Sequence, residues 1–318
     1  MAKKTEVLTR LDDAARAGWL YYVAGRTQDE IASAMGISRQ SAQRLVSLAV
    51  AERLIKVRLD HPIAACMELA EALKERFGLK QAEVIPSDPG SESTISGMAE
   101  AAAAEVERWL RRTDPIVMAL GTGRTLKATV DQLPTIECPH HRIVSLTGNI
   151  TPDGSAAYYN VIFSMADAVK ARHFPMPLPV LASTAKERET LHSQQLVQST
   201  LKISAQADVT LVGIGELGVD GPLCVDGFLE KDEMIDLIEA GAAGEICGWI
   251  FDSKGRLLDN AVNKRVASAP VPSRETSLVI GIAKGRRKLK AIHAALLGHQ
   301  VNALITDEDT AAAILGHV

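Results

Sequence analysis

Apolar residues recur at helical spacing through the first part of the chain. Between residues 7 and 24 they fall every three or four positions, which predicts a helix that ends at Gly25. The sequence TQDE, beginning at Thr27, has the form of a capping box, so a short second helix is expected there and should end at Gly36. Ser38 can cap a third helix. Helix, short helix, glycine turn and helix in that order predict a helix-turn-helix.

The third predicted helix carries the side chains that suit contact with DNA. In a helix-turn-helix the start of the last helix enters the major groove, where Arg and Gln can pair with base edges and Ser with phosphates. The alternating segment 55–61 predicts a small β-wing that places Lys56 and Arg58 near the DNA backbone. The alternative is a three-helix packing unit with a polar face, but the capped short helix and the concentration of such groups in one turn favour DNA binding. The residues expected to contact DNA are Thr27, Gln28, Ser38, Arg39, Gln40, Ser41, Gln43 and Arg44.

After residue 61 the pattern changes to short apolar runs that alternate with helical stretches. This alternation predicts an α/β domain with a mainly parallel sheet covered on both faces. Two domains are therefore expected, 1–60 and 61–318, and the hairpin signal at 252–255 indicates a local antiparallel excursion. The predicted strands are 82–86, 116–120, 143–147, 209–214, 246–251, 278–283 and 302–306, and the predicted helices are 67–78, 92–112, 124–133, 155–172, 187–206, 230–242, 286–297 and 307–316.

Four of the predicted strands lead into polar or glycine-rich turns. Ligands of such sheets bind outside the carboxyl ends of the strands, where these turns meet helix N-termini. The turn 120–125 offers amides, hydroxyls and a guanidinium to a phosphate, although it lacks the spacing of a Walker A or dinucleotide motif. The turns 147–149 and 213–221 add amides and carboxylates. The turn 283–288 places cations at a helix start, where they oppose the helix dipole, and a bound anion would remove this conflict. Together they favour a small phosphorylated or polyhydroxy ligand over plain turns.

The distribution of charge also divides the chain into two unlike parts. The chain has 318 residues and a net charge of −4, but residues 1–60 hold ten basic and seven acidic side chains, whereas the remainder holds 25 and 32. This asymmetry suggests a small anion-facing module joined to an acidic body. The N-terminus lacks a signal peptide's apolar core and no run is long enough to span a bilayer, so a cytoplasmic protein is expected. The four cysteines are widely spaced and expected to be reduced, and the histidines show no metal spacing.

Several sequence segments, distributed over essentially the whole chain, together resemble those of the SorC/DeoR-type sugar-binding transcriptional regulators. They are YYVAGRTQDEIASAMGISRQSAQRLV, GTGRT, LTGN, GIGELGVDG, GAAGEICGWIFD and KGRRKLKAIHAALLG with NALITDEDTA. The resemblance implies a winged helix-turn-helix and a Rossmann-like effector domain similar to the ribose-5-phosphate isomerase and glucosamine-6-phosphate deaminase fold. It also implies a homotetramer, a dimer of dimers, on double-stranded operator DNA. Thr122 stands where many members have Trp, and Lys284 where many have Gly.

The function expected is a regulator of carbohydrate or polyol metabolism whose operator affinity is controlled by a small sugar, sugar-phosphate or polyol effector. The alternative is a phosphosugar isomerase- or deaminase-like enzyme, but a helix-turn-helix would have no purpose there. No catalytic residue, cofactor or metal is expected. In the resembling family the loop at 121–125, the acid at Glu245 and the lysine at Lys288 line the effector site. With the other strand exits, the expected effector-binding residues are Gly121, Thr122, Gly123, Arg124, Thr125, Gly148, Asn149, Asp220, Glu245 and Lys288.

Overall fold

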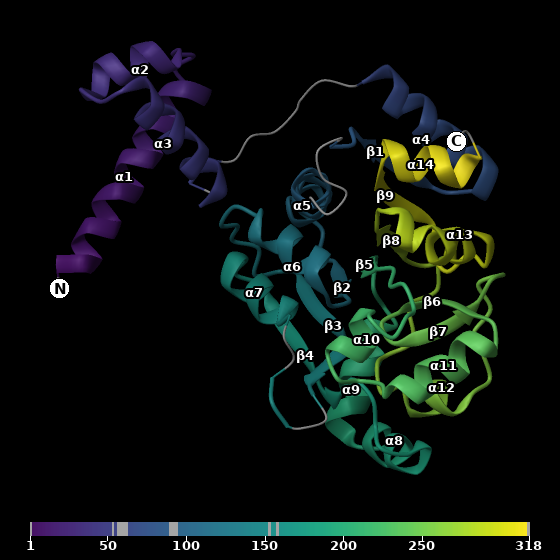
Figure 1. Cartoon of the computed structure of the whole chain (residues 1–318). Coiled ribbons are helices and arrows are strands. Elements are labelled where there is room, and N and C mark those ends of the chain that lie inside the picture. The colour runs from purple at the N-terminus through teal and green to yellow at the C-terminus, as the bar shows by residue number, and fades with distance from the viewer. Residues whose placement is uncertain are drawn as a thin grey trace. The chain divides into compact units, whose positions relative to one another are not determined.

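The computed structural model of the chain forms two compact units, Met1–His61 and Pro62–Val318. The residues described are 2–52, 54–55, 63–88, 95–151, 154–156 and 159–316, and for residues 2–9 the backbone alone is described. Figure 1 shows a helical smaller unit and a larger unit in which helices surround a sheet. Among the described residues, no helix is both long enough and apolar enough to cross a membrane.

The smaller unit consists of α1 (Ala2–Tyr22), α2 (Gln28–Met35) and α3 (Arg39–Ala51). Thr27 and Glu30 form the predicted capping box at the start of α2, and Gly36 ends that helix in the left-handed conformation at φ 67°. The Ser38 hydroxyl accepts a hydrogen bond from the Ser41 amide and so caps α3. The three predicted helices are therefore present. The predicted wing at 55–61 lies outside the described residues apart from Ile55.

A seven-stranded sheet, parallel throughout, forms the centre of the larger unit. Its order is β1-β9-β8-β5-β2-β3-β4. The inner strands read as short apolar runs because both faces of the sheet are covered. The strands are β1 (Gln81–Ile85), β2 (Val117–Leu120), β3 (Arg142–Ile150), β4 (Arg172–Pro179), β5 (Val209–Gly213), β8 (Leu278–Ile282) and β9 (Ala303–Asp307).

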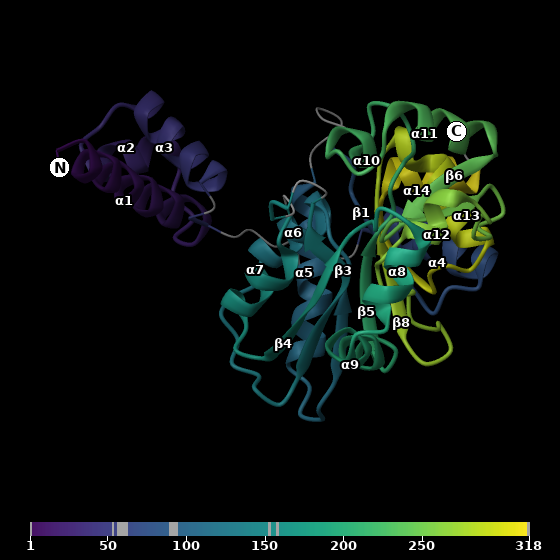
Figure 2. The same ribbon diagram turned by 90° about the horizontal axis from the view of Figure 1, so that it is seen from below.

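Two helix layers bury the two faces of this sheet, as Figures 1 and 2 show. Side chains from one face of β2, such as Val117 and Ala119, enter a core with α4, α9, α13 and α14, whereas the alternating Met118 and Leu120 enter a second core with α5, α6 and α7. This alternation is the period of two expected of a strand. The bounds are α4 (Ala64–Phe77), α5 (Ser96–Leu110), α6 (Arg124–Asp131), α7 (Val161–Ala168), α9 (Gln195–Ser204), α13 (Leu289–Leu297) and α14 (Glu308–Leu315).

The apolar run 246–251, predicted as one more strand of the sheet, instead bends into a separate hairpin. Its strands β6 (Ala242–Ile246) and β7 (Trp249–Asp252) pair antiparallel through a turn at Cys247 and Gly248, both at positive φ. A small core of its own supports this hairpin. The helices around it are α8 (Ala185–His192), α10 (Pro222–Val225), α11 (Lys231–Glu239) and α12 (Ala261–Arg265).

Strand β4 was not predicted, and several predicted helices are shorter or divided. Residues 172–179 read RHFPMPLP, and prolines suppress the strand signal because they cannot donate ladder hydrogen bonds. The structure tolerates them because β4 lies at the edge of the sheet. The predicted helix 155–172 is reduced to α7, and 187–206 divides into α8 and α9. The start of 286–297 is the 3₁₀ turn η1 (Arg286–Lys288).

Candidate functional site

A cavity of about 1150 Å³ opens at the carboxyl edge of the sheet. Residues that follow β2, β3, β5 and β8 line one part of it, and the hairpin β6–β7 with the segment around α10 lines the rest. The strands are parallel, so their carboxyl ends share one edge, which is the usual ligand position in open α/β sheets. All four predicted strand exits thus contribute at least one residue to a single site.

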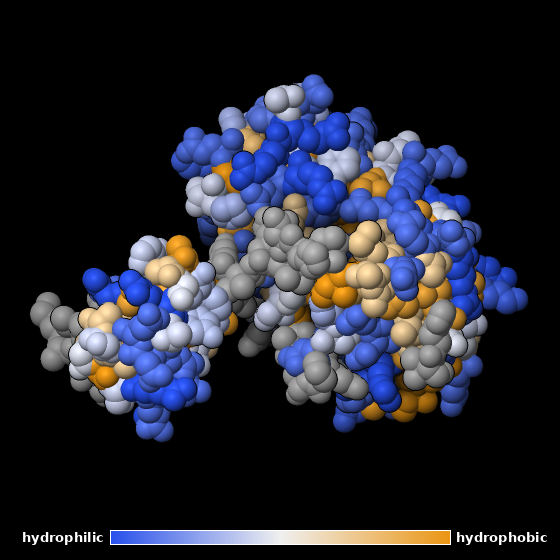
Figure 3. Space-filling view, turned by 90° about the horizontal axis from the view of Figure 1, so that it is seen from above, coloured by the Kyte–Doolittle hydropathy of each residue, from blue (hydrophilic) through white to orange (hydrophobic). Residues whose placement is uncertain are grey.

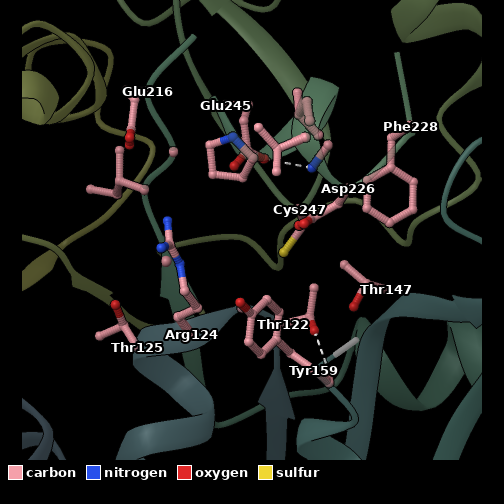
Figure 4. Close-up of a pocket in the computed structure, with 18 of the residues that line it drawn as sticks. Thr122, Arg124, Thr125, Thr147, Tyr159, Glu216, Asp226, Phe228, Glu245 and Cys247 are labelled. Carbon is pink, nitrogen blue, oxygen red and sulfur yellow. Dashed lines mark hydrogen bonds between the residues drawn. The ribbon is translucent and has the colours of Figure 1, made fainter. Parts of the chain in front are cut away.

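The turn after β2 presents a cationic side chain to this cavity. Gly123, at φ 115°, precedes α6 and no side chain caps this helix start. Arg124 points into the cavity in Figure 4 and its guanidinium has no partner among the described residues. The neighbouring Thr122 hydroxyl donates to the Tyr159 carbonyl at 2.7 Å and fixes the turn. Free backbone amides at a helix start and a neighbouring guanidinium are groups that commonly bind a phosphate.

A carboxylate and lysine cluster forms the wall next to this turn. Glu245 accepts a hydrogen bond from the Gly248 amide at 2.8 Å, and Lys288 donates to the Ile214 carbonyl at 2.9 Å. Lys288 Nζ also lies 3.6 Å from Glu216 Oε2, a buried oxygen that has no hydrogen bond. Burial raises the pKa of Glu245, against the lowering effects of the Gly248 hydrogen bond and the Lys288 charge. The cluster offers acceptors to ligand hydroxyl groups.

Gly215 is required for this arrangement. A Cβ placed on Gly215 would lie 1.9 Å from Glu245 Oε1. The two backbones are also paired, because the amide of each donates to the carbonyl of the other. The close approach that only glycine permits therefore positions the Glu245 carboxylate in the cavity wall.

Two of the basic residues after β8 form ion pairs with carboxylates outside the cavity lining, one buried and one exposed. Lys284 forms an ion pair of 2.9 Å with Asp307, with side chains only 6% and 5% exposed. Asp307 also caps α14 through the Thr310 amide, at 3.1 Å. Arg287 pairs with Asp220 at 2.8 Å. The expectation that the cations of this turn gather around a bound anion is therefore wrong for Lys284, whose charge is already satisfied.

The wall opposite Arg124 contains Asp226 and Phe228, which the sequence did not indicate, and Thr147 of the predicted strand exit 147–149. Figure 4 shows Phe228 and Thr147 across the cavity from Arg124, with Asp226 and Cys247 between them. Burial and the Glu245 charge raise the pKa of the Cys247 thiol far above its usual value, so it remains neutral. Asp226 and Phe228 follow α10, too far from a glycine-rich strand exit for that signal to include them.

The predicted effector residues divide into two groups. Thr122, Gly123, Arg124, Thr125, Glu245 and Lys288 line the cavity. Gly121, Gly148, Asn149 and Asp220 do not belong to its described lining. Gly148 has a structural role, since a Cβ there would lie 2.0 Å from the Leu178 carbonyl oxygen where β3 meets β4. Asp220 forms an exposed ion pair with Arg287, which does line the cavity.

The predicted DNA-contacting residues lie at the start of α2 and along the first turns of α3. The Ser38 hydroxyl caps α3 and lies 2.9 Å from the Ser41 hydroxyl, and the side chain of Thr27 caps α2. Arg39 lies 3.5 Å from Asp29 in an exposed ion pair, which is worth little in solution. The exposed side chains that no described residue engages are Gln40, Gln43 and Arg44, and Gln28 is partly exposed.

A helix-turn-helix unit joined to an α/β unit, whose cavity is lined in part by charged and hydroxyl side chains, defines a class of protein, the DNA-binding regulator with a ligand-sensing domain. The comparisons with known proteins agree. Residues 61–316 match the family described as "Putative sugar-binding domain". The chain is 34% identical over 304 residues to the erythritol catabolism regulatory protein EryD of Brucella abortus (strain 2308), covering 95% of this chain and 96% of that protein.

Two further relatives point the same way. The transcriptional regulator LsrR of Escherichia coli (strain K12) is 31% identical over 309 residues, covering 96% of this chain and 94% of LsrR. The crystal structure of the full-length sorbitol operon regulator SorC from Klebsiella pneumoniae superposes with a TM-score of 0.69 and 26% identity, covering 96% and 99% of the two chains. The chain belongs to the SorC family of sugar-binding transcriptional regulators. The comparisons therefore favour the regulator over the enzyme alternative.

Proposed function

We propose that this regulator binds operator DNA through α3 and that a phosphorylated sugar or polyol in the cavity controls its operator affinity. The observation that carries the effector class is the Arg124 guanidinium, which no described residue pairs with, beside the uncapped start of α6. A phosphate at that position would satisfy the guanidinium and the free amides together. The relative EryD is named for erythritol catabolism, which favours the derivative of a short polyol.

The effector would act by holding two parts of the larger unit together. The cavity lies between the carboxyl edge of the sheet and the hairpin β6–β7 with α10, so a bound ligand contacts both. A ligand that prefers one spacing of these parts shifts the population of conformations. A coupling of about 1–3 kcal/mol between the two sites would change operator affinity by about 5- to 150-fold.

We further propose a homotetramer, a dimer of dimers, that acts in the cytoplasm, where the operator DNA is. Exposed apolar side chains on the larger unit support self-association, because large exposed apolar patches usually mark interaction sites. Leu196 of α9 is 68% exposed, and Ile235 and Ile238 of α11 are 44% and 43% exposed. Figure 3 shows apolar patches among the polar side chains on one face of this unit.

The test of the effector class uses an operator selected from random-sequence DNA and fluorescence anisotropy. Phosphates of four- to six-carbon polyols and sugars are titrated into the complex. We expect at least one of them to change the operator affinity by fivefold or more. In Arg124→Ala the affinity for DNA alone should remain and the response to ligand should be lost.

The matched control is Arg111→Ala, which removes an exposed arginine that pairs with Glu107 in α5. This variant should respond to ligand as the unmodified protein does. An unchanged response in Arg124→Ala, or a response to the free polyols alone, would contradict a phosphate at this position.

A further inference from the structure

We propose that Asp226 and Phe228 form a second subsite of the cavity, which accepts the uncharged, hydroxyl-bearing end of the effector and rejects a second phosphate. The inference rests on the proposed function, in which Arg124 holds the first phosphate. It adds that the effector is a monophosphate and identifies the residues that select it. The subsite comes from the segment around α10.

The positions of these two residues support the subsite. Asp226 follows the short helix α10, and Gly227, at φ 74°, turns the chain so that Phe228 also lines the cavity. Part of the Phe228 ring packs on the small core of the hairpin β6–β7, which supports it from behind. In Figure 4 the ring lies across the cavity from Arg124, and Asp226 lies between them.

The Asp226 carboxylate is chemically available. It is partly buried and no described residue donates a hydrogen bond to it or pairs with it. An ionised carboxylate only accepts hydrogen bonds, and its two oxygens can accept from two neighbouring hydroxyl groups. The apolar face of a sugar or polyol carbon chain can lie against the Phe228 ring. A carboxylate beside an aromatic ring therefore suits a polyhydroxy group.

The distribution of charge makes the same subsite unfavourable for an anion. Three of the basic residues in the cavity lining already pair with carboxylates: Lys284 with Asp307, Arg287 with Asp220 and Lys288 with Glu216. Arg124, which pairs with no described residue, lies on the other side of the cavity. A phosphate carries about −1.5 to −2 charges at neutral pH, so one placed beside Asp226 would meet a like charge, and among the described residues no basic side chain pairs with this carboxylate to offset it. Specificity achieved through such a repulsive contact is common in selective binding sites.

The experiment compares matched phosphate esters on the full-length protein by isothermal titration calorimetry. The probes are fructose 6-phosphate with fructose 1,6-bisphosphate, and ribulose 5-phosphate with ribulose 1,5-bisphosphate, together with erythritol 4-phosphate. We expect a monophosphate to bind at least tenfold more tightly than the bisphosphate of the same carbon skeleton. In Asp226→Asn, which keeps the shape of the side chain, this ratio should fall at least threefold, chiefly because the bisphosphate binds better.

Two further variants separate the roles. Phe228→Leu should weaken monophosphate binding about three- to tenfold and leave the ratio between the two esters unchanged, because it removes the ring and no charge. Asp236→Asn neutralises an exposed carboxylate of α11 outside the cavity lining and should change neither value. Thermal unfolding without ligand checks that each variant folds.

The outcomes distinguish this inference from the proposed function. A bisphosphate that binds as tightly as its monophosphate, or a ratio unaffected by Asp226→Asn, overturns the subsite and leaves the phosphorylated effector standing. Failure of every phosphate ester to bind, with binding of free polyols, overturns the phosphorylated effector and the subsite with it.

Discussion

Replacement of Asp307 by Asn tests whether the buried ion pair with Lys284 holds the cavity wall together. The two side chains are 2.9 Å apart and 6% and 5% exposed, so Asp307→Asn leaves a lysine charge buried without a counter-charge. Asn can still cap α14 through the Thr310 amide, which limits the change to the loss of charge. Removal of one partner of a buried pair costs about 3–5 kcal/mol, and we expect the free energy of unfolding to fall by that amount at pH 7.

The assay is urea unfolding followed by tryptophan fluorescence, with a double-mutant cycle. Lys284→Met keeps the length of the side chain without its charge, and in the double variant Lys284→Met/Asp307→Asn no unpaired charge remains. The double variant should therefore recover most of the loss, with a coupling energy of about 2–3 kcal/mol. A loss below about 1 kcal/mol in Asp307→Asn, or no recovery in the double variant, would show that the buried pair does not stabilise the cavity wall.

The same pair predicts a dependence of stability on pH. Burial alone would raise the pKa of Asp307, but the hydrogen bonds from Thr310 and Lys284 and the lysine charge outweigh it and lower this pKa below its ordinary value of 3.8. A carboxyl group whose pKa is lowered by folding contributes stability that is present above its ordinary pKa. This stability is lost as the pH falls through the folded-state pKa. The acid limb of the stability profile should be shallower in Asp307→Asn.

Three other predictions concern separate parts of the chain. Gly215→Ala should displace Glu245, because the Glu245 oxygen lies 1.9 Å from the position of the new Cβ. Effector affinity measured by calorimetry should fall about 10- to 100-fold. The loss of stability should be small, because the flexible Glu245 side chain can move aside. Arg44→Ala and Gln43→Ala should each weaken operator binding by about 1–3 kcal/mol in anisotropy without changing effector affinity, whereas equal operator affinity would rule out base contacts from α3. Burial lowers the pKa of His141, whose Nδ1 accepts a hydrogen bond from the Ile116 amide. Its contribution to stability should therefore decrease as the pH falls below about 6.5, the ordinary pKa of a histidine. Urea titrations at pH 5 to 7 measure this dependence, and the control variant His140→Gln should retain it.

The smaller unit was largely predictable because its signals are local. Capping at Thr27 and Ser38 and the left-handed turn at Gly36 act within four residues, so spacing along the chain is enough to detect them. The inner strands were predictable for a related reason, because burial on both faces demands an apolar run. Strand β4 was missed because its prolines are tolerated only at a sheet edge, and edge position is a property of the assembled sheet.

The cavity was predictable only in part. The turn at Thr122–Thr125 and the residues Glu245 and Lys288 carry sequence signals and line the cavity. Asp226 and Phe228 carry no such signal. They line the cavity because the segment around α10 packs on the small core of the hairpin β6–β7, which is separate from the main sheet. The apolar run 246–251 has the composition of a sheet strand, and what diverts it is the turn at Cys247 and Gly248 together with its neighbours in space.

The class of fold, the helix-turn-helix and the polar strand exits follow from the order of residues alone, since they depend on periodicity and on residues close together in the chain. The tertiary structure alone decided which charges are available to a ligand. Lys284 and Arg287 are both cations of one turn in the sequence, yet they pair with Asp307 and Asp220, which lie 23 and 67 residues away, and only the pair of Lys284 is buried. Electrostatic pairing depends on distance in space, so only the folded chain shows that Arg124 and Asp226 both line the cavity and that no described residue pairs with either of them.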